Sequence, residues 1–278
     1  MTTQLAADTG SARPGGNSLP VSAFFVDSLA LAKRQLIRTV RTPQTAIAAV
    51  TSPILFLALF RYVFGGAIPI QNMTYVDYIV PAMLVQNIVF GGFQSATGLS
   101  QDAADGIVDR FRSLPSPRAA LLAGRALADT LTQFVAHALV IVTGVIIGFR
   151  FHTGALNLVL FLVLLLAIGV GLFSVFAAMG LSTRNAETVN ALTLPGFLLL
   201  FVSSAFIPVA TLPGWLQGFA KYQPITVFTD TLRYLLQSDI STSVLEHSRT
   251  WYLLGSLGWA AVLTGIGGTV ALNAYRRL

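Results

Sequence analysis

Residues 101–125 read QDAADGIVDRFRSLPSPRAALLAGR and form a short polar segment between two long apolar runs. Their spacing predicts a short amphipathic helix over residues 105–114, because apolar and charged residues each recur at intervals of three and four. The apolar side of this helix consists of Ile107, Phe111 and Leu114. The charged side consists of Asp105, Asp109 and Arg112. Pro115 and Pro117 end the helix, since proline lacks an N–H donor and biases the preceding residue away from helix.

Two interpretations of residues 101–125 are open from these residues alone. The segment is either a solvated loop between two membrane spans or a docking helix for a soluble partner protein. Both interpretations require that the flanking apolar runs cross a membrane, so the rest of the chain has to be considered first.

The composition indicates that most of the 278-residue chain faces lipid. Hydrophobic residues make up 54% of the chain and charged residues 10%, whereas a soluble domain carries about 25% charged residues. The formal charge of +6 rests on few groups, so it indicates membrane topology and argues against a nucleic-acid partner. The chain has no cysteine, which excludes disulfides, thiol catalysis and cysteine-ligated metals.

The first 41 residues fall into two parts. Residues 1–20 are rich in Gly, Ser, Thr, Ala and Pro, which predicts a disordered cytoplasmic tail. Residues 21–41 predict an amphipathic interfacial helix with one apolar stripe and one basic face, suited to an anionic lipid surface. The basic face consists of Lys33, Arg34, Arg38 and Arg41. The alternative is an ordinary cytoplasmic helix packed on protein.

The remaining residues, 42–278, predict an all-α integral membrane domain with six transmembrane helices. Six apolar runs reach the length of about 20 residues that a span needs. They are residues 44–64, 78–99, 119–149, 156–181, 189–208 and 251–274.

Residues 210–236, before the last run, follow a different pattern. Leu212-Pro-Gly-Trp215 and Gln223-Pro224 each precede a helical stretch that is too short to cross the bilayer. This predicts two short re-entrant half-helices in the outer leaflet, or a small extracellular cap.

The basic residues predict the orientation of the spans. With the N-terminus inside, the 17 Lys and Arg residues lie on the cytoplasmic side with these exceptions: Arg61, Arg150, Lys221, Arg233 and Arg249. This asymmetry predicts that both termini and residues 101–125 are cytoplasmic.

The sequence carries no recognisable catalytic or nucleotide-binding motif. The dipeptide Gly-Lys never occurs, so a phosphate-binding loop of the usual kind is absent. His137, His152 and His247 lie far apart, without the spacing of a zinc site. Asp129 lies four residues after Arg125, which predicts a helical ion pair. His137 is expected to bond a neighbouring helix, and a proton relay of His137 and Asp129 is the alternative.

The fourth and fifth runs are rich in phenylalanine and glycine. Their aromatic, apolar character suits a path for an apolar or amphipathic cargo, and it suits plain lipid-facing packing equally well. The candidate cargo-path residues are Phe173, Phe197, Phe201 and Phe206.

With these features in view, the chain resembles the membrane subunit of a type-2 ATP-binding-cassette (ABC) exporter, of the daunorubicin-resistance permease kind found in actinobacteria. The resemblance covers nearly the whole length. It rests on the basic N-terminal helix, the six runs and the stretch DGIVDRFRSLP at residues 105–115, followed by Arg118 and Arg125. Further support comes from GFRFH at 148–152, TRN at 183–185, PGW at 213–215 and QPI at 223–225.

By this resemblance, residues 101–117 form the coupling helix that seats in a groove of a separate ATPase subunit. The residues implied in coupling are Asp105, Gly106, Ile107, Asp109, Arg110, Phe111, Arg112, Leu114, Pro115 and Arg118. The resemblance also implies that two permease chains, identical or paralogous, pair around a central path in the bacterial inner membrane. ATP and Mg would bind to the partner ATPase, with no cofactor on this chain.

The expected function is therefore that of a permease subunit in an ATP-driven exporter of a hydrophobic or amphipathic compound, such as a drug, an antibiotic or a lipid. The subunit itself is not expected to be an enzyme. Two alternatives are an ion-coupled secondary multidrug carrier and an intramembrane enzyme. The first would use His137 and Asp129, and the second lacks a catalytic constellation in the sequence.

Overall fold

A computed structural model describes residues 51, 54–66, 68, 70, 72–105, 118–183, 185–238 and 245–277, with the backbone alone for residues 118–129 and 131. Three predicted features lie outside these residues: the tail at 1–20, the interfacial helix at 21–41 and residues 106–117 of the coupling helix. The predicted Arg125–Asp129 ion pair also concerns side chains that are not described.

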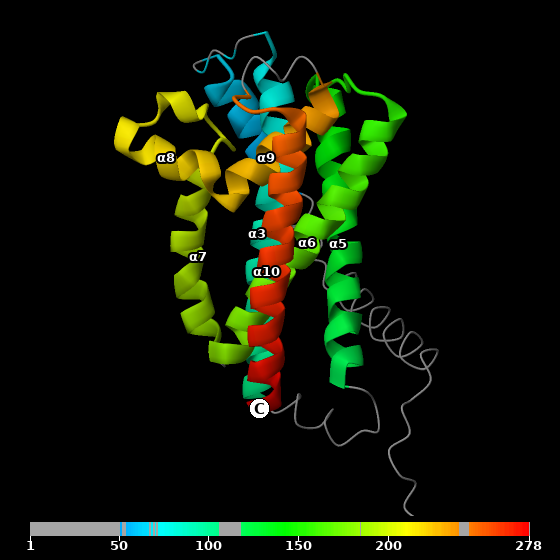
Figure 1. The fold of residues 1–278 in the computed structure, drawn as a ribbon, viewed down its shortest axis with the longest axis vertical. Coiled ribbons are helices and arrows are strands. Elements are labelled where there is room, and N and C mark those ends of the chain that lie inside the picture. The colour runs from blue at the N-terminus through cyan, green and yellow to red at the C-terminus, as the bar shows by residue number, and fades with distance from the viewer. Residues whose placement is uncertain are drawn as a thin grey trace, which may run out of the picture.

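The described part of the chain is helical, and long helices run side by side along the long axis of the molecule (Figure 1). The long helices are α3 (Tyr75–Ala104), α5 (Arg118–Ile147), α6 (Ala155–Thr183) and α10 (Arg249–Arg277). A shorter helix, α7 (Ala186–Phe201), runs beside them, and residues Ile54–Phe64 form another that ends in the π-helical turn η1 (Phe60–Phe64).

Two short helices lie at the end of the bundle opposite the C-terminus (Figure 1). They are α8 (Gly214–Tyr222) and α9 (Pro224–Gln237), and they follow the 3₁₀ turn η2 (Val209–Thr211). Gln223 ends α8 and begins α9 in an extended conformation, which separates the two helices. Pro224 suits the first position of α9, because the N–H that it lacks has no partner within a helix there. We call this end of the bundle the α9 end and the other the C-terminal end.

Helix α3 lies at the centre of the bundle and packs against α5, α6, α7 and α9. Its most apolar 18-residue window is 83% buried, against 33% for α6 and 17% for α10, so α6 and α10 present broad apolar faces outward. Close approach of α6 to α3 depends on Gly180, where an added Cβ atom would lie 2.4 Å from the carbonyl oxygen of Ala96. Small residues of this kind let helix backbones approach closely in lipid.

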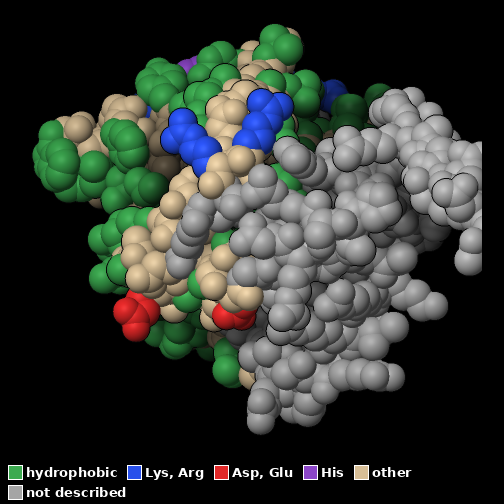
Figure 2. Space-filling model, turned by 90° about the horizontal axis from the view of Figure 1, so that it is seen from below, with side chains coloured by type: hydrophobic (Ala, Val, Ile, Leu, Met, Phe, Trp, Pro, Cys, Tyr) green, Lys and Arg blue, Asp and Glu red, His purple; other side chains and the backbone are tan. Residues whose placement is uncertain are grey.

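Three described helices, α3, α6 and α10, are long and apolar enough to cross a membrane, in agreement with the second, fourth and sixth predicted runs. The first, third and fifth runs overlap shorter apolar helices, which are Ile54–Phe64, Thr132–Ile147 and Ala186–Phe201. Acidic and basic side chains lie on the face at the C-terminal end, with hydrophobic side chains around them (Figure 2).

Two predicted boundaries differ from the structure in ways that matter for the site. The coupling helix was expected from residue 101, but residues 101–104 are the last turn of α3, and Asp105 is the residue that ends it. The fifth run was expected to continue to residue 208, but α7 ends at Phe201. The reason is a polar turn after Phe201, followed by the buried residues Ala205 and Phe206, whose apolar character extended the run in the sequence.

Candidate functional site

An arginine buried at the α9 end holds the half-helix α9 against the start of α3. Arg233 is 1% exposed. Its Nη1 forms an ion pair with Asp230 one turn earlier in α9. Its Nε and Nη2 donate to the carbonyl oxygen of Tyr78 in α3 at 3.3 and 3.1 Å. The guanidinium also lies 3.7 Å from the centre of the Tyr78 ring, a cation–π contact.

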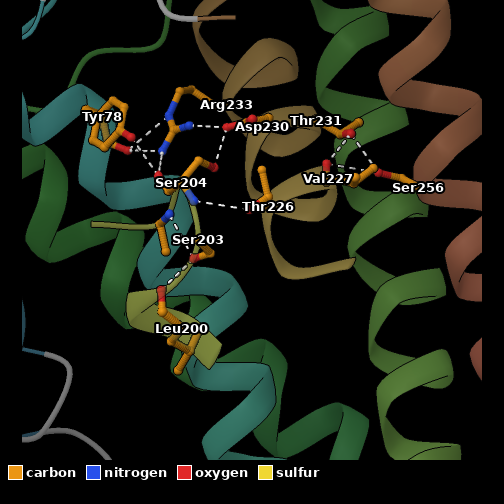
Figure 3. Close-up of polar contacts among 11 residues, drawn as sticks. Tyr78, Leu200, Ser203, Ser204, Thr226, Val227, Asp230, Thr231, Arg233 and Ser256 are labelled. Carbon is orange, nitrogen blue, oxygen red and sulfur yellow. Dashed lines mark hydrogen bonds and ion pairs between the residues drawn. The ribbon is translucent and has the colours of Figure 1, made fainter. Parts of the chain in front are cut away.

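The same arginine reaches the turn that follows α7 (Figure 3). Its Nη2 donates to the carbonyl oxygen of Ser204 at 3.1 Å, and the Tyr78 hydroxyl donates to that oxygen at 2.7 Å. The Ser204 hydroxyl donates to Asp230 Oδ1 at 2.7 Å. We call Tyr78, Ser204, Asp230 and Arg233 the Arg233 clamp. It joins α3, α9 and the turn after α7.

Buried charges of this kind need complete pairing, because an unpaired charge in an apolar interior is costly. In the clamp, Arg233 donates to two carbonyl oxygens and one carboxylate, and Asp230 accepts from both Arg233 and Ser204. Arginine suits this position because its planar fork of donors can reach several acceptors at once. The clamp therefore specifies how α9 is oriented on α3.

A second polar layer lies beside the clamp and fixes the turn between α5 and α6. Asp77 accepts from the Arg150 backbone N–H at 3.1 Å. Gln237 at the end of α9 donates to the Arg150 carbonyl oxygen at 3.0 Å, and its Oε1 lies 2.8 Å from His152 Nδ1. The motif GFRFH at 148–152 thus connects α3 to α9, so the α9 end is held by hydrogen bonds between several elements.

Helix α9 is also tied to α10. The Thr231 hydroxyl donates to the carbonyl oxygen of Tyr252 at 2.9 Å. Its oxygen also lies 2.6 Å from the Ser256 hydroxyl (Figure 3). These side chains are buried. The half-helix is therefore linked by polar contacts to both of its main neighbours.

Six phenylalanine rings on the α7 side form a closed circuit, with 4.7 to 6.4 Å between successive ring centres. In order around the circuit they are Phe56, Phe60, Phe206, Phe201, Phe197 and Phe90. We call this set the phenylalanine ring. It brings together the helix at 54–64, α3, α7 and the turn after α7.

The phenylalanine ring extends from the interior of the bundle to its surface. Phe60 and Phe206 are buried, whereas Phe201 is 41% exposed. Beside Phe201 on α7, Leu194 and Leu198 are also exposed. This arrangement offers aromatic faces at the edge of the bundle to another apolar group.

The structure brings together three of the four candidate cargo-path residues. Phe197, Phe201 and Phe206 all belong to the phenylalanine ring. Phe173 lies apart, packed against the smaller cluster formed by the ends of α3, α6 and α10. Sequence reasoning did not identify Phe56, Phe60 and Phe90 as neighbours of this group, because they lie on other helices.

Of the candidate coupling residues, the structure describes Asp105 completely and Arg118 by its backbone only. Asn185, the last residue of the motif TRN, has a local structural role at the C-terminal end of the bundle. The Asn185 side chain accepts from the backbone N–H groups of Glu187 at 2.8 Å and Thr188 at 3.4 Å, and so caps the start of α7.

His137 contacts a neighbouring helix, as the sequence predicts. Its Nε2 lies 3.2 Å from the carbonyl oxygen of Leu84 in α3, and the ring is buried. One turn away, Gln133 donates to the carbonyl oxygen of Asn87 at 2.9 Å. These contacts form a polar seam between α5 and α3. Among the described residues, no cluster of three His, Cys, Asp or Glu side chains could hold a metal ion.

The residues that the sequence analysis missed are those of the Arg233 clamp. Arg233 was counted there only as a charge for topology. A signal was present, since Asp230 and Arg233 are an acid and a base three residues apart within the apolar stretch 225–236. Such a pair in an apolar half-helix indicates a buried contact.

Comparison with known proteins agrees with this architecture. Residues 27–236 match the family model described as "ABC-2 type transporter". The daunorubicin resistance ABC transporter permease protein DrrB1 of Streptomyces coeruleorubidus is 33% identical over 195 residues, which cover 70% of this chain and 69% of that protein.

Two further relatives extend the match. The probable doxorubicin resistance ABC transporter permease protein DrrC of Mycobacterium tuberculosis is 25% identical over 277 residues, 99% of this chain and 98% of that protein. The putative transport permease ycf38 of Cyanophora paradoxa is 29% identical over 241 residues, 84% and 83% of the two chains. The all-helical, membrane-spanning chain described above therefore belongs to the ABC-2 type transporter family of permeases.

Proposed function

We propose that this chain is the membrane subunit of an ATP-driven exporter for hydrophobic or amphipathic compounds, such as planar aromatic drugs or lipids. A separate ATPase subunit would bind ATP and Mg, and a second permease chain would complete the path. The proposal draws support from the family and from relatives whose names describe resistance to daunorubicin or doxorubicin.

The observation that carries the choice of cargo is the phenylalanine ring. Aromatic pairs contribute about 0.5–1.5 kcal/mol beyond the area that they bury, which favours a cargo with flat aromatic or apolar surface. Phe201, at 41% exposure, offers the cargo an accessible ring at the edge of the circuit. In the proposed orientation the α9 end faces outward and the C-terminal end faces the cytoplasm.

The proposed motor contact lies at the C-terminal end. Residues 105–114 would seat in the ATPase through Ile107, Phe111 and Leu114. The charged side chains on the face at this end (Figure 2) are consistent with a soluble partner. A coupling segment that follows α3 directly would transmit force into the helix at the centre of the bundle.

Export of an anthracycline by cells that express the permease with its ATPase partner tests the cargo assignment. We expect Phe201→Ala to raise the half-saturating concentration about two- to tenfold, from the loss of one aromatic contact. Phe151→Ala is the matched control, since Phe151 is 42% exposed and packs edge-to-face against Phe149 outside the phenylalanine ring. If Phe201→Ala and Phe151→Ala have equal half-saturating concentrations, the phenylalanine ring is not part of the cargo path.

Co-purification of the permease with its ATPase tests the docking assignment. Phe111→Asp puts a charge on the apolar side of the coupling helix, so we expect loss of the ATPase and of export while the protein still inserts in the membrane. Phe151→Asp, at the α9 end, should leave co-purification intact. Retention of the ATPase by Phe111→Asp would refute the docking assignment, and export that follows the proton gradient at constant ATP would favour an ion-coupled carrier.

A further inference from the structure

An open apolar groove of about 470 Å³ runs between α10 and the half-helices at the α9 end. Trp251, Trp259 and Val262 line it from α10, and Tyr222 and Val227 from the half-helices. The floor contains Gly255 and Gly258. The groove lies on α10, a helix long enough to span the membrane. It therefore opens toward the lipid of the leaflet at the α9 end.

The length of the groove matches one leaflet. Its lining on α10 extends from residue 251 to residue 262, which is about 16 Å at a rise of about 1.5 Å per residue. The hydrocarbon core of a bilayer is about 30 Å thick, so one leaflet contributes about 15 Å. A single acyl chain lying along α10 would therefore fill the groove from the interface to about the middle of the bilayer.

The outer end of the groove carries a paired positive and negative charge. Lys221, next to Tyr222, forms a 2.7 Å ion pair with Glu246, and both side chains are partly exposed. Glu246 is followed by His247, whose ring stacks on Trp251 at 4.2 Å and lies 6.1 Å from the Tyr222 ring. Trp and Tyr side chains of this kind favour the level of the lipid headgroups.

We propose that this groove is a binding site for phosphatidylethanolamine in the leaflet at the α9 end. The acyl chain lies over Gly255 and Gly258, the headgroup phosphate pairs with the Lys221 ammonium, and the headgroup ammonium pairs with the Glu246 carboxylate. A zwitterionic headgroup complements this pair of charges, whereas phosphatidylglycerol provides a partner for Lys221 alone. The site is separate from the phenylalanine ring and does not depend on the export function.

Tryptophan fluorescence offers a direct probe, because the chain has three tryptophans and two of them line the groove. Trp215 is 82% exposed, so Trp215→Phe leaves Trp251 and Trp259 as the reporters with little effect on packing. The full-length variant is reconstituted in nanodiscs with increasing fractions of phosphatidylethanolamine or phosphatidylglycerol that carry brominated acyl chains. Half-maximal quenching is expected at a fraction of brominated phosphatidylethanolamine about two- to fivefold lower than that of phosphatidylglycerol.

Two further substitutions in the Trp215→Phe background test the site. A Cβ atom at Gly258 meets nothing within 4 Å, so the backbone there accepts a side chain. Gly258→Phe is expected to fill the groove and to abolish the preference. Gly265→Phe is the control. Gly265 lies two helical turns along the same face, is equally open and does not line the groove, so this variant should keep the preference.

The headgroup assignment has its own variant. Glu246→Gln leaves Lys221 without its carboxylate, so the preference should reverse toward phosphatidylglycerol. Equal quenching curves for the two lipids, or a preference that Gly258→Phe leaves unchanged, would overturn the proposal and identify the bound molecules as ordinary boundary lipid. A preference for phosphatidylglycerol before the Glu246→Gln change would also overturn it.

Discussion

Helices α9 and α7 both pack against α3, but they do so by different kinds of contact. Most of α9 is buried, and the Arg233 clamp ties it to α3 through an ion pair and hydrogen bonds. Helix α7 has two buried residues, Val189 and Leu200, and the Phe197 ring of α7 stacks on Phe90 of α3. A hydrogen bond also joins the two helices, from the Thr97 hydroxyl in α3 to Asn190 Oδ1 in α7 at 3.2 Å.

This difference has a mechanical consequence. Hydrogen bonds to a buried charge are satisfied in a narrow range of geometries, whereas contacts between apolar rings are individually weak and tolerate sliding. We therefore expect α3 and α9 to behave as one rigid unit. We expect α7 to shift against it, except at the end of α7 that Arg233 and Gln223 hold through the turn after the helix. The candidate cargo path lies on the α7 side of the bundle.

Among the variants that test this difference between α9 and α7, removal of the clamp arginine should lower stability the most. Arg233→Met leaves Asp230 buried without its cation and removes donors from the Tyr78 and Ser204 carbonyl oxygens. Loss of one partner from a buried ion pair costs about 3–5 kcal/mol, so the melting temperature of the purified protein should fall steeply. The control is Arg249→Met, which removes a part-buried hydrogen bond to Asn157 and should have a small effect.

A double variant distinguishes the ion pair from simple packing. Asp230→Leu combined with Arg233→Met removes both charges, so part of the lost stability should return. A double variant that melts below Arg233→Met would show that the arginine acts through its contacts with Tyr78 and Ser204 more than through Asp230.

Two glycine substitutions test whether α7 is packed less rigidly than the helix pair α3 and α6. At Gly180 a new Cβ atom would meet the Ala96 backbone oxygen at 2.4 Å, and at Gly196 in α7 it would meet the Phe93 ring at 2.3 Å. Backbone cannot move aside easily, so Gly180→Ala should cost about 1–3 kcal/mol of stability, as overpacked sites do. Gly196→Ala should cost less, because a side chain and a loosely held helix can both adjust. Equal losses in thermal denaturation would contradict the proposed mobility of α7.

The smallest effect is expected at the polar bond between α3 and α7. Thr97→Val removes the hydroxyl that donates to Asn190 and keeps the shape of the side chain. Hydrogen bonds between membrane helices contribute about 0.6 kcal/mol on average, so the melting temperature should change little. A loss as large as that of Arg233→Met would mean that α7 is held by polar contacts after all.

The positions of the main helices could be predicted from hydropathy, but the end of α7 could not. Residues 189–208 read as one apolar run, yet the chain turns after Phe201. The Gln223 side chain donates to the carbonyl oxygens of Leu199, at 3.1 Å, and Val202, which would otherwise lack partners at the helix end. These partners come from a residue more than twenty positions away, so no local pattern reveals them.

The candidate sites divide in the same way. The candidate cargo-path phenylalanines were proposed from composition, but the closed circuit of Phe197, Phe201 and Phe206 with rings from other helices depends on how four segments pack. Phe173 has the same residue type and the same apolar setting in the sequence, yet it lies in another cluster. The predicted coupling residues 106–117 stay a prediction, because they lie outside the described residues.

The sequence by itself determined that this protein is a helical membrane permease with two short helices before the last span. Apolar runs, scarce charges and the breaks at Pro213-Gly214 and Gln223-Pro224 are local properties, so they can be recognised directly in the sequence. Only the tertiary structure decided that Arg233 is a buried clamp, that six phenylalanines meet in a ring and that α10 carries a groove one leaflet long. Each of these depends on contacts between residues distant in the chain, and the free energy of such contacts exists only once the helices are packed.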